Sequence, residues 1–137
     1  MKLPIPYGHQ SITDEDIEAV TRVLKSDYLT CGPAIPVFEK DFSEYIGVKY
    51  AAAVCNATCA LHLAANAMGV KPGDNIICTP LTFASSANCI RFMGGNVKFV
   101  DINPDTFLLD IDKLRATLEA SPKCTYKGMV IVDFAGY

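Results

Sequence analysis

The order of apolar and polar positions divides the chain into a helical N-terminal stretch and a longer stretch of alternating strands and helices. Thr13 followed by three acidic residues is typical of a helix N-terminus, and apolar residues at helical spacing continue that helix to Ser26. Pro36 suits the first turn of a second helix, which Gly47 is expected to end. These signals predict an N-terminal helical arm over residues 1–48.

From residue 49 onward, short apolar runs alternate with segments of helical periodicity. The expected strands are residues 50–54, 75–79, 96–102 and 128–134, and the expected helices are 58–68, 83–93 and a segment from the capping residue Asp110 to about Ala120. The last apolar run is nearly continuous, as in strands buried on both faces. Strands separated by such helices indicate right-handed crossovers and a mainly parallel sheet with helices on both faces. The fold class is therefore α/β, with residues 49–137 as one domain.

Composition excludes several classes of partner. The 137 residues carry 12 basic and 15 acidic side chains, and a net charge of -3 gives no reason to expect nucleic acid. No window reaches the roughly 18 unbroken apolar residues of a membrane span. The N-terminus has no apolar core of the length that signal peptides need. A soluble, cytoplasmic protein is expected.

The six cysteines are expected to be reduced and mostly buried, because no secretion signal accompanies them. Four of them lie in or beside apolar segments: Cys55, Cys78, Cys89 and Cys124. Cys55 and Cys59 are separated by three residues, whereas redox and zinc pairs have two. Because only His9 and His62 are available as further ligands, no metal site is expected.

One polar turn between an apolar run and a helix has the make-up of an anion site. In the stretch from Asn56 to Cys59, free backbone N–H groups of a helix N-terminus converge beside the Thr58 hydroxyl. A phosphate suits such a site best. The turn contains no glycine, so it is neither a P-loop nor a dinucleotide fingerprint. An ordinary strand-to-helix turn capped by Thr58 is the alternative, and the residues alone leave both open.

Two further candidates follow expected strands. Phe83 comes after Thr79-Pro80 and precedes a run of small residues, so it is either a platform for a planar ligand or a core side chain. The residues alone favour the core. Asp133 either binds a ligand or caps the turn that follows it. Since ligand sites form just beyond parallel strands, a chain that stops there is expected to be part of a longer product.

Together these segments resemble one family over essentially the whole chain, the DegT/DnrJ/EryC1/StrS sugar aminotransferases. These enzymes use pyridoxal 5'-phosphate on the type I, aspartate aminotransferase-like fold. The matching pieces are residues 5–8, 29–33, 38–39, 56–64, 73–74, 79–83, 87–88, 99–102 and 133–136. The resemblance implies that residues 49–137 are a truncated large domain, a partial cofactor-binding domain for pyridoxal phosphate.

The resemblance also implies roles for five residues. Thr58 and Cys59 match the pair that binds the cofactor phosphate, although cysteine is a departure from the usual alanine or serine. Phe83 matches the aromatic residue that stacks on the cofactor ring. Tyr7 and Thr30 belong to segments that lie near the sugar nucleotide.

Within the family, residues 7–12 and 86–89 look most like the UDP-4-amino-4,6-dideoxy-N-acetyl-β-L-altrosamine transaminases of pseudaminic acid biosynthesis. That branch implies transfer of an amino group from glutamate to the 4-keto carbon of a UDP-linked deoxysugar, in a homodimer. The lysine that binds the cofactor as a Schiff base, and the carboxylate on its pyridine nitrogen, are implied to lie beyond Tyr137. No catalytic residue is therefore assigned to this chain, which is expected to be inactive alone.

Two alternatives remain open. One is a sugar dehydratase of the same family, in which a histidine replaces the lysine. The other is a non-catalytic α/β module that binds a phosphorylated ligand or a partner chain.

Overall fold

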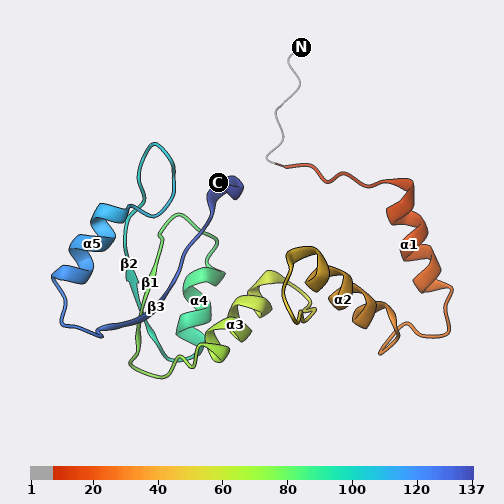
Figure 1. Ribbon diagram of the computed structural model, residues 1–137, viewed down its shortest axis with the longest axis horizontal. Helices are drawn as coiled ribbons and strands as arrows, with labels where there is room; N and C mark the ends of the chain where they lie inside the picture. Colours follow the sequence, from red (N-terminus) through yellow and green to blue (C-terminus); the bar gives the residue numbers. More distant parts are fainter. Residues whose placement is uncertain (1–7) are drawn as a thin grey trace, which may run out of the picture. The chain divides into compact units, whose positions relative to one another are not determined.

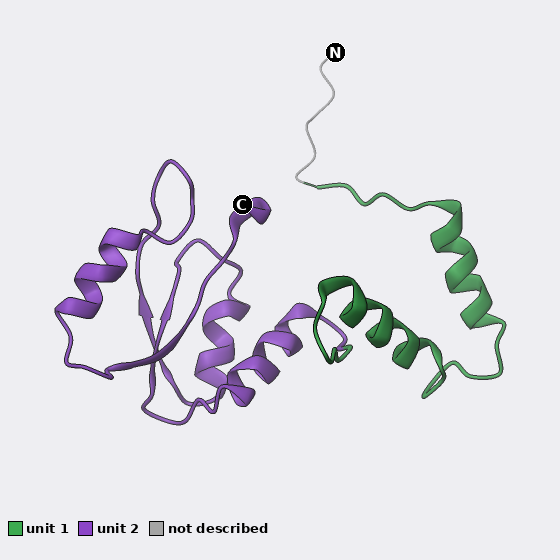
Figure 2. Cartoon of the chain, viewed as in Figure 1, with its two compact units in different colours: residues 1–53 green, residues 54–137 purple. Residues whose placement is uncertain are grey.

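The computed structural model describes residues 8–137, so Tyr7 lies outside the described residues. The chain forms two compact units, residues 1–53 and 54–137 (Figure 2).

Unit 1 contains two helices, α1 (Asp14–Leu24) and α2 (Ala34–Ile46). Thr13 caps α1 through a capping box, in which its hydroxyl accepts the N–H of Asp16 while the Asp16 carboxylate accepts the N–H of Thr13 at 2.9 Å. Gly47 ends α2 with a left-handed φ of 77°. The predicted start of the first helix and end of the second are confirmed.

The apolar faces of these two helices remain exposed within the described structure. No residue of α1 is buried, and Phe38 of α2 is 57% exposed. An apolar helix face gains stability only when another element covers it, so local signals are enough to place these helices but not to bury them.

Unit 2 contains a three-stranded sheet, with α3 and α4 on one face and α5 on the other (Figure 1). The strand order is β2-β1-β3, and both neighbouring pairs are parallel. The elements are α3 (Ala57–Ala67), β1 (Asn75–Cys78), α4 (Ser85–Phe92), β2 (Asn96–Phe99), α5 (Ile111–Glu119), β3 (Tyr126–Val130) and the short 3-10 helix η1 (Phe134–Gly136). The prediction of an α/β fold with a parallel sheet is confirmed.

The central strand β1 divides the core into two clusters, because successive side chains of a strand point to opposite faces. Ile76 and Cys78 are fully buried in the cluster that includes Ile90 of α4 and Ala65 of α3. Ile77 points the other way and packs with Val100 and Leu109, against which Leu114 of α5 lies. Both faces of β1 are therefore covered.

Two strand predictions are wrong. Residues 50–54 form no strand, and the N–H of Ala53 donates to the Glu39 carboxylate at 2.8 Å instead of to a neighbouring strand. The last strand is Tyr126–Val130 rather than residues 128–134, and it is not buried on both faces, because its side chains alternate between half-buried and exposed. The partners of a strand and the elements that cover its faces come from distant segments, so neither can be read from its own residues.

The cysteine prediction is wrong in part. All six thiols are free, and Cys78 and Cys89 are buried as expected. Cys55 and Cys124 are exposed, because each lies in a turn rather than inside the apolar segment beside it.

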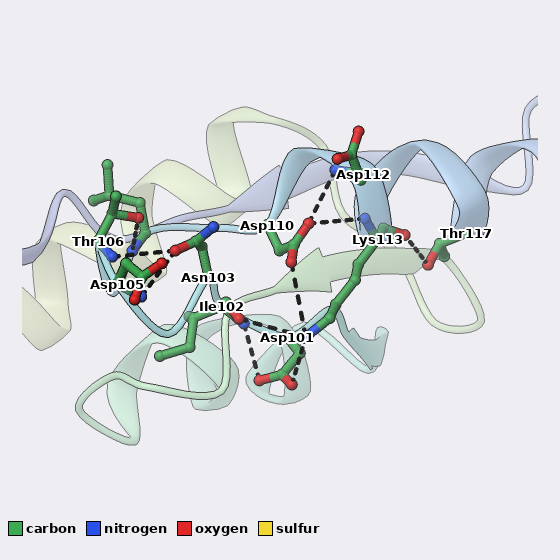
Figure 3. A network of polar contacts seen from close by, with 10 residues as sticks. Asp101, Ile102, Asn103, Asp105, Thr106, Asp110, Asp112, Lys113 and Thr117 are labelled. Atoms are coloured by element: carbon green, nitrogen blue, oxygen red, sulfur yellow. Dashed lines mark hydrogen bonds and ion pairs between the residues drawn. The ribbon is translucent and has the colours of Figure 1, made fainter.

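A polar network holds the loop after β2 against the start of α5 (Figure 3). Asp110 caps α5 as predicted, accepting the N–H groups of Asp112 and Lys113 at 3.0 Å. The Lys113 ammonium donates to the Asp101 carboxylate at 3.0 Å, and this contact lowers the pKa of Asp101 and raises that of Lys113. The carboxylates of Asp101 and Asp110 thus bind the Lys113 ammonium or backbone N–H groups, so these contacts account for the network without a ligand.

Replacing Asp74 by asparagine is expected to lower the melting temperature at pH 7 but not at pH 2. Lys127 of β3 donates to the Asp74 carboxylate at 2.8 Å and also to the carbonyl of Gly69, and the contact lowers the pKa of Asp74. A lowered pKa means that the ionised form stabilises the fold above the ordinary value of 3.8, and that this stability is lost as pH falls through the folded pKa. Thermal unfolding monitored by circular dichroism from pH 2 to pH 7 measures the difference.

The control is Asp105→Asn, because the Asp105 carboxylate forms no hydrogen bond or ion pair with the described residues. Its melting temperature is expected to follow the parent chain at every pH. An Asp74→Asn deficit that is the same at pH 2 and pH 7 would contradict the ion-pair explanation.

Candidate functional site

The topology brings the N-termini of α3 and α4 to the same edge of the sheet. The helix α3 leads into the start of β1, and α4 returns from the end of β1, so both helices run opposite to the parallel strands (Figure 1). These two helices also pack against each other. Their N-termini therefore both lie at the carboxyl edge, where ligands bind in open α/β sheets.

The first turn of α3 is capped by Asn56, not by Thr58. The Asn56 side chain accepts the N–H of Cys59 at 2.9 Å, and its backbone is extended, as at other N-caps. Thr58 is half-buried, and its hydroxyl forms no hydrogen bond among the described residues. The interpretation of Thr58 as an ordinary satisfied cap is therefore wrong. Sequence reasoning missed this role, although asparagine just before a helix is a favoured cap.

At this turn of the described chain, the backbone N–H groups without an acceptor are those of Ala57 and Thr58, whereas the expected phosphate-binding pair is Thr58 and Cys59. The N–H groups of Ala57 and Thr58 have no acceptor among the described residues, whereas the N–H of Cys59 is held by Asn56. An anion can thus meet two free N–H groups and the Thr58 hydroxyl directly. It reaches the Cys59 N–H only by displacing the Asn56 side chain.

Phe83 lies in the turn that leads from β1 into α4, and its side chain is 77% exposed. The interpretation as a core residue is therefore wrong. The same turn is closed by a hydrogen bond between the hydroxyls of Thr82 and Ser86, which lie 2.6 Å apart, and Ser86 is buried. An exposed aromatic ring at the same edge as an anion site can hold a planar ligand that carries a phosphate.

A buried hydroxyl at this edge has no partner. Thr79 directly follows β1, is 1% exposed, and its Oγ1 accepts or donates no hydrogen bond among the described residues. Buried polar atoms are nearly always paired, so an unpaired one at the end of a central strand calls for a partner that the described residues do not supply.

The remaining candidates are less informative. Thr30 is exposed in unit 1, in a turn so tight that a Cβ on Gly32 would lie 2.8 Å from the Cβ of Tyr28. Thr30 belongs to unit 1, whereas Thr58, Cys59 and Phe83 belong to unit 2, and Tyr7 lies outside the described residues. The Asp133 side chain is exposed and does not cap η1, which leaves its carboxylate free at the carboxyl end of β3.

Asn56→Ala is expected to destabilise unit 2 by about 1 kcal/mol, because the N–H of Cys59 loses its acceptor. Chemical denaturation measures the loss. Asn56→Asp keeps a side-chain acceptor at the cap and is expected to retain the stability of the parent chain. Equal losses in the two variants would show that the cap does not depend on the acceptor oxygen.

Residues 8–137 contain neither a candidate membrane span nor a candidate metal site. None of the helices there has both the length and the apolar character to span a bilayer. Nor do those residues bring three or more histidine, cysteine or acidic side chains into an arrangement that would hold a metal ion.

The chain is similar to bacterial proteins of polysaccharide and nucleotide-sugar biosynthesis. It is 42% identical over 132 residues to the spore coat polysaccharide biosynthesis protein SpsC of Bacillus subtilis, covering 96% of this chain and 33% of SpsC. It is 41% identical over 133 residues to the UDP-4-amino-4,6-dideoxy-N-acetyl-β-L-altrosamine transaminase of Campylobacter jejuni, covering 96% of this chain and 34% of that enzyme. The chain thus spans about a third of the length of these relatives.

Solved structures show the same fold. The proposed sugar aminotransferase Spr1654 of Streptococcus pneumoniae, in its PMP form, superposes with a TM-score of 0.82 at 31% identity, over 97% of this chain and 32% of that one. The Escherichia coli GDP-4-keto-6-deoxy-D-mannose-3-dehydratase with bound hydrated PLP gives 0.79 at 28% identity, over 90% and 33%. The family model of the DegT/DnrJ/EryC1/StrS aminotransferases matches residues 10–137. This chain belongs to the DegT/DnrJ/EryC1/StrS aminotransferase family.

Proposed function

We propose that this chain supplies the N-terminal part of a pyridoxal-phosphate-dependent aminotransferase that acts on a nucleotide sugar. The observation that carries the proposal is the carboxyl edge of the sheet, which holds both the open N–H groups of Ala57 and Thr58 and the exposed ring of Phe83. The similarity to sugar aminotransferases supports the same assignment.

The residues at this edge fit pyridoxal phosphate. The first turn of α3 would hold the phosphate through the N–H groups of Ala57 and Thr58 and the Thr58 hydroxyl, with the Cys59 N–H available once Asn56 moves. Phe83 would stack on the ring. The unpaired Thr79 hydroxyl at the end of β1 is consistent with a polar ligand at this edge. When bound, the cofactor supplies an electron sink for moving protons between carbon atoms.

This fit assigns a different role to each of two stretches of the chain. Residues 49–137 would form part of the cofactor-binding domain, and residues 1–48 a helical arm. Thr30 and Tyr7 are proposed to lie near the sugar nucleotide. The two compact units of the structure divide after residue 53, a few residues beyond the proposed boundary, and this division supports a separate N-terminal arm.

The relatives support a nucleotide sugar as substrate, and the finer assignment is part of the proposal. We infer a UDP-linked 4-keto deoxysugar as amino acceptor in pseudaminic acid-type sugar biosynthesis, supported by 41% identity to the Campylobacter jejuni transaminase. Glutamate is proposed as the amino donor on the family resemblance alone. The chain is about as similar to the spore coat protein SpsC, so another deoxysugar of the same chemical class is the alternative substrate. The full-length enzyme is proposed to be a homodimer.

Absorbance titration with pyridoxal phosphate tests the cofactor assignment on the 137-residue chain. Saturable binding is expected for the parent chain and weaker binding for Thr58→Ala, whose melting temperature should not change. No saturable binding would contradict the assignment and favour a module for another phosphorylated ligand. Because no lysine of this chain is assigned to the reaction, the chain alone is expected to show no steady transamination.

A sugar dehydratase is the second candidate, favoured by the TM-score of 0.79 with the Escherichia coli dehydratase. The two candidates differ at one residue, which is proposed to follow Tyr137 in the longer protein. Borohydride treatment of that protein with pyridoxal phosphate discriminates between them. Covalent trapping of the cofactor indicates a lysine and an aminotransferase, whereas its absence despite binding indicates the dehydratase.

A further inference from the structure

Two thiols are in contact at the first turn of α3. The Sγ atoms of Cys55 and Cys59 lie 3.4 Å apart. Cys55 is exposed and comes just before the capping residue Asn56, and Cys59 is half-buried in the first turn of the helix. A disulfide bond has a sulfur–sulfur distance of about 2.05 Å, so closing this pair requires a movement of little more than 1 Å in a surface turn.

We propose that Cys55 and Cys59 form a redox-modification site that closes to an intramolecular disulfide by exchange with a small-molecule disulfide such as oxidised glutathione. The Cys55 thiolate attacks one sulfur of the small disulfide, which releases one small thiol and leaves a mixed disulfide on Cys55. The Cys59 thiolate then attacks the Cys55 sulfur and releases the second small thiol. The two protein thiols lose two electrons, the small disulfide gains them, and the two released thiols carry the protons.

The surroundings of the two thiols fit this order of attack. Cys55 is the exposed member and meets the external disulfide first. The contact with Cys55 raises the pKa of the Cys59 thiol, which favours Cys55 as the first nucleophile. The second step is intramolecular, so it does not depend on the exposure of Cys59.

The disulfide would fix the cap of α3. Asn56 lies between the two cysteines, where its amide donates to the Cys55 sulfur at 3.5 Å and its carbonyl accepts the Cys59 N–H at 2.9 Å. A covalent ring through residues 55–59 holds the side chain of Asn56 over the first turn. If the proposed function is correct, the phosphate of pyridoxal phosphate then cannot recruit the Cys59 N–H, and oxidation weakens cofactor binding.

Peptide mapping of the reduced 137-residue chain after incubation with oxidised glutathione tests the disulfide. Free thiols are alkylated, and chymotrypsin, which cuts after Tyr50 and Leu61, releases residues 51–61 with both cysteines. The expected peptide carries no alkyl group and no glutathione and is lighter than the reduced peptide by two hydrogen atoms. Cys55→Ser and Cys59→Ser are each expected to retain glutathione on the remaining cysteine.

Cys124→Ser is the matched control, because it removes an exposed thiol outside the pair and should leave the ring closure unchanged. Burial raises the pKa of Cys78 to about 11 and also raises that of Cys89, so neither competes in the exchange. A peptide 51–61 with glutathione on both cysteines, or an unreacted one while Cys124 is modified, would overturn the proposal.

Amide hydrogen exchange tests the effect on the cap without any cofactor. The Cys59 amide is expected to exchange about tenfold more slowly in the oxidised chain than in the reduced one. Equal rates would overturn the locking of the cap.

In a parallel titration, pyridoxal phosphate is expected to bind the reduced chain several-fold more tightly than the oxidised chain. Failure of both forms to bind would count against the proposed function, while the mapping and exchange results still decide the disulfide.

Discussion

Replacing Ile76 by alanine is expected to lower the free energy of unfolding of unit 2 by about 2–5 kcal/mol. Ile76 is fully buried in the central strand and packs in the cluster with Ile90 and Ala65. Truncation removes three methyl or methylene groups and leaves a cavity between the sheet and its two covering helices. Because natural domains are stable by only about 5–15 kcal/mol, the variant is expected to lose a large share of its cooperative folding.

Chemical denaturation followed by circular dichroism measures this loss. Ile111→Ala is the matched control, because it removes the same groups from a side chain that is 60% exposed at the start of α5. Its effect is expected to stay within about 0.5 kcal/mol. Similar losses in the two variants would mean that the strand β1 does not carry the core.

Features decided by neighbouring residues in the chain could be predicted from the sequence. The capping residues Thr13 and Asp110 and the terminating Gly47 act through bonds to groups a few residues away, and all three appear as expected. The parallel order of strands also follows from local rules, since strands joined by helices have few alternatives.

Features that depend on distant partners could not be predicted in this way. The apolar run at residues 50–54 has the composition of a strand, but no described strand pairs with it. The exposure of β3 likewise depends on what covers an edge strand. At the candidate site, the residues indicated an anion turn, but only the structure shows that Asn56 holds the Cys59 N–H and leaves Ala57 and Thr58 open.

The exposure of the Phe83 ring could not be predicted from the residue pattern around it. An aromatic residue before a helix of small residues is more often buried, yet this one is 77% exposed. Local periodicity does not report exposure, because one turn of backbone decides whether the ring points into the core or away from it. The exposure leaves the ring accessible to a ligand, so its removal is a direct test of the proposed site.

Phe83→Ala is expected to weaken binding of pyridoxal phosphate by roughly ten- to a hundredfold, because stacking and burial of the ring are worth about 1.5–3 kcal/mol. Absorbance titration measures the affinity, and Phe83→Tyr should preserve most of it. Phe92→Ala removes a ring that is 60% exposed at the other end of α4, so it should leave the affinity unchanged. The melting temperature of Phe83→Ala should match the parent chain, because the exposed ring contributes little to the core. A large loss of stability without a change in affinity would instead place Phe83 in the packing of the fold and remove it from the cofactor site.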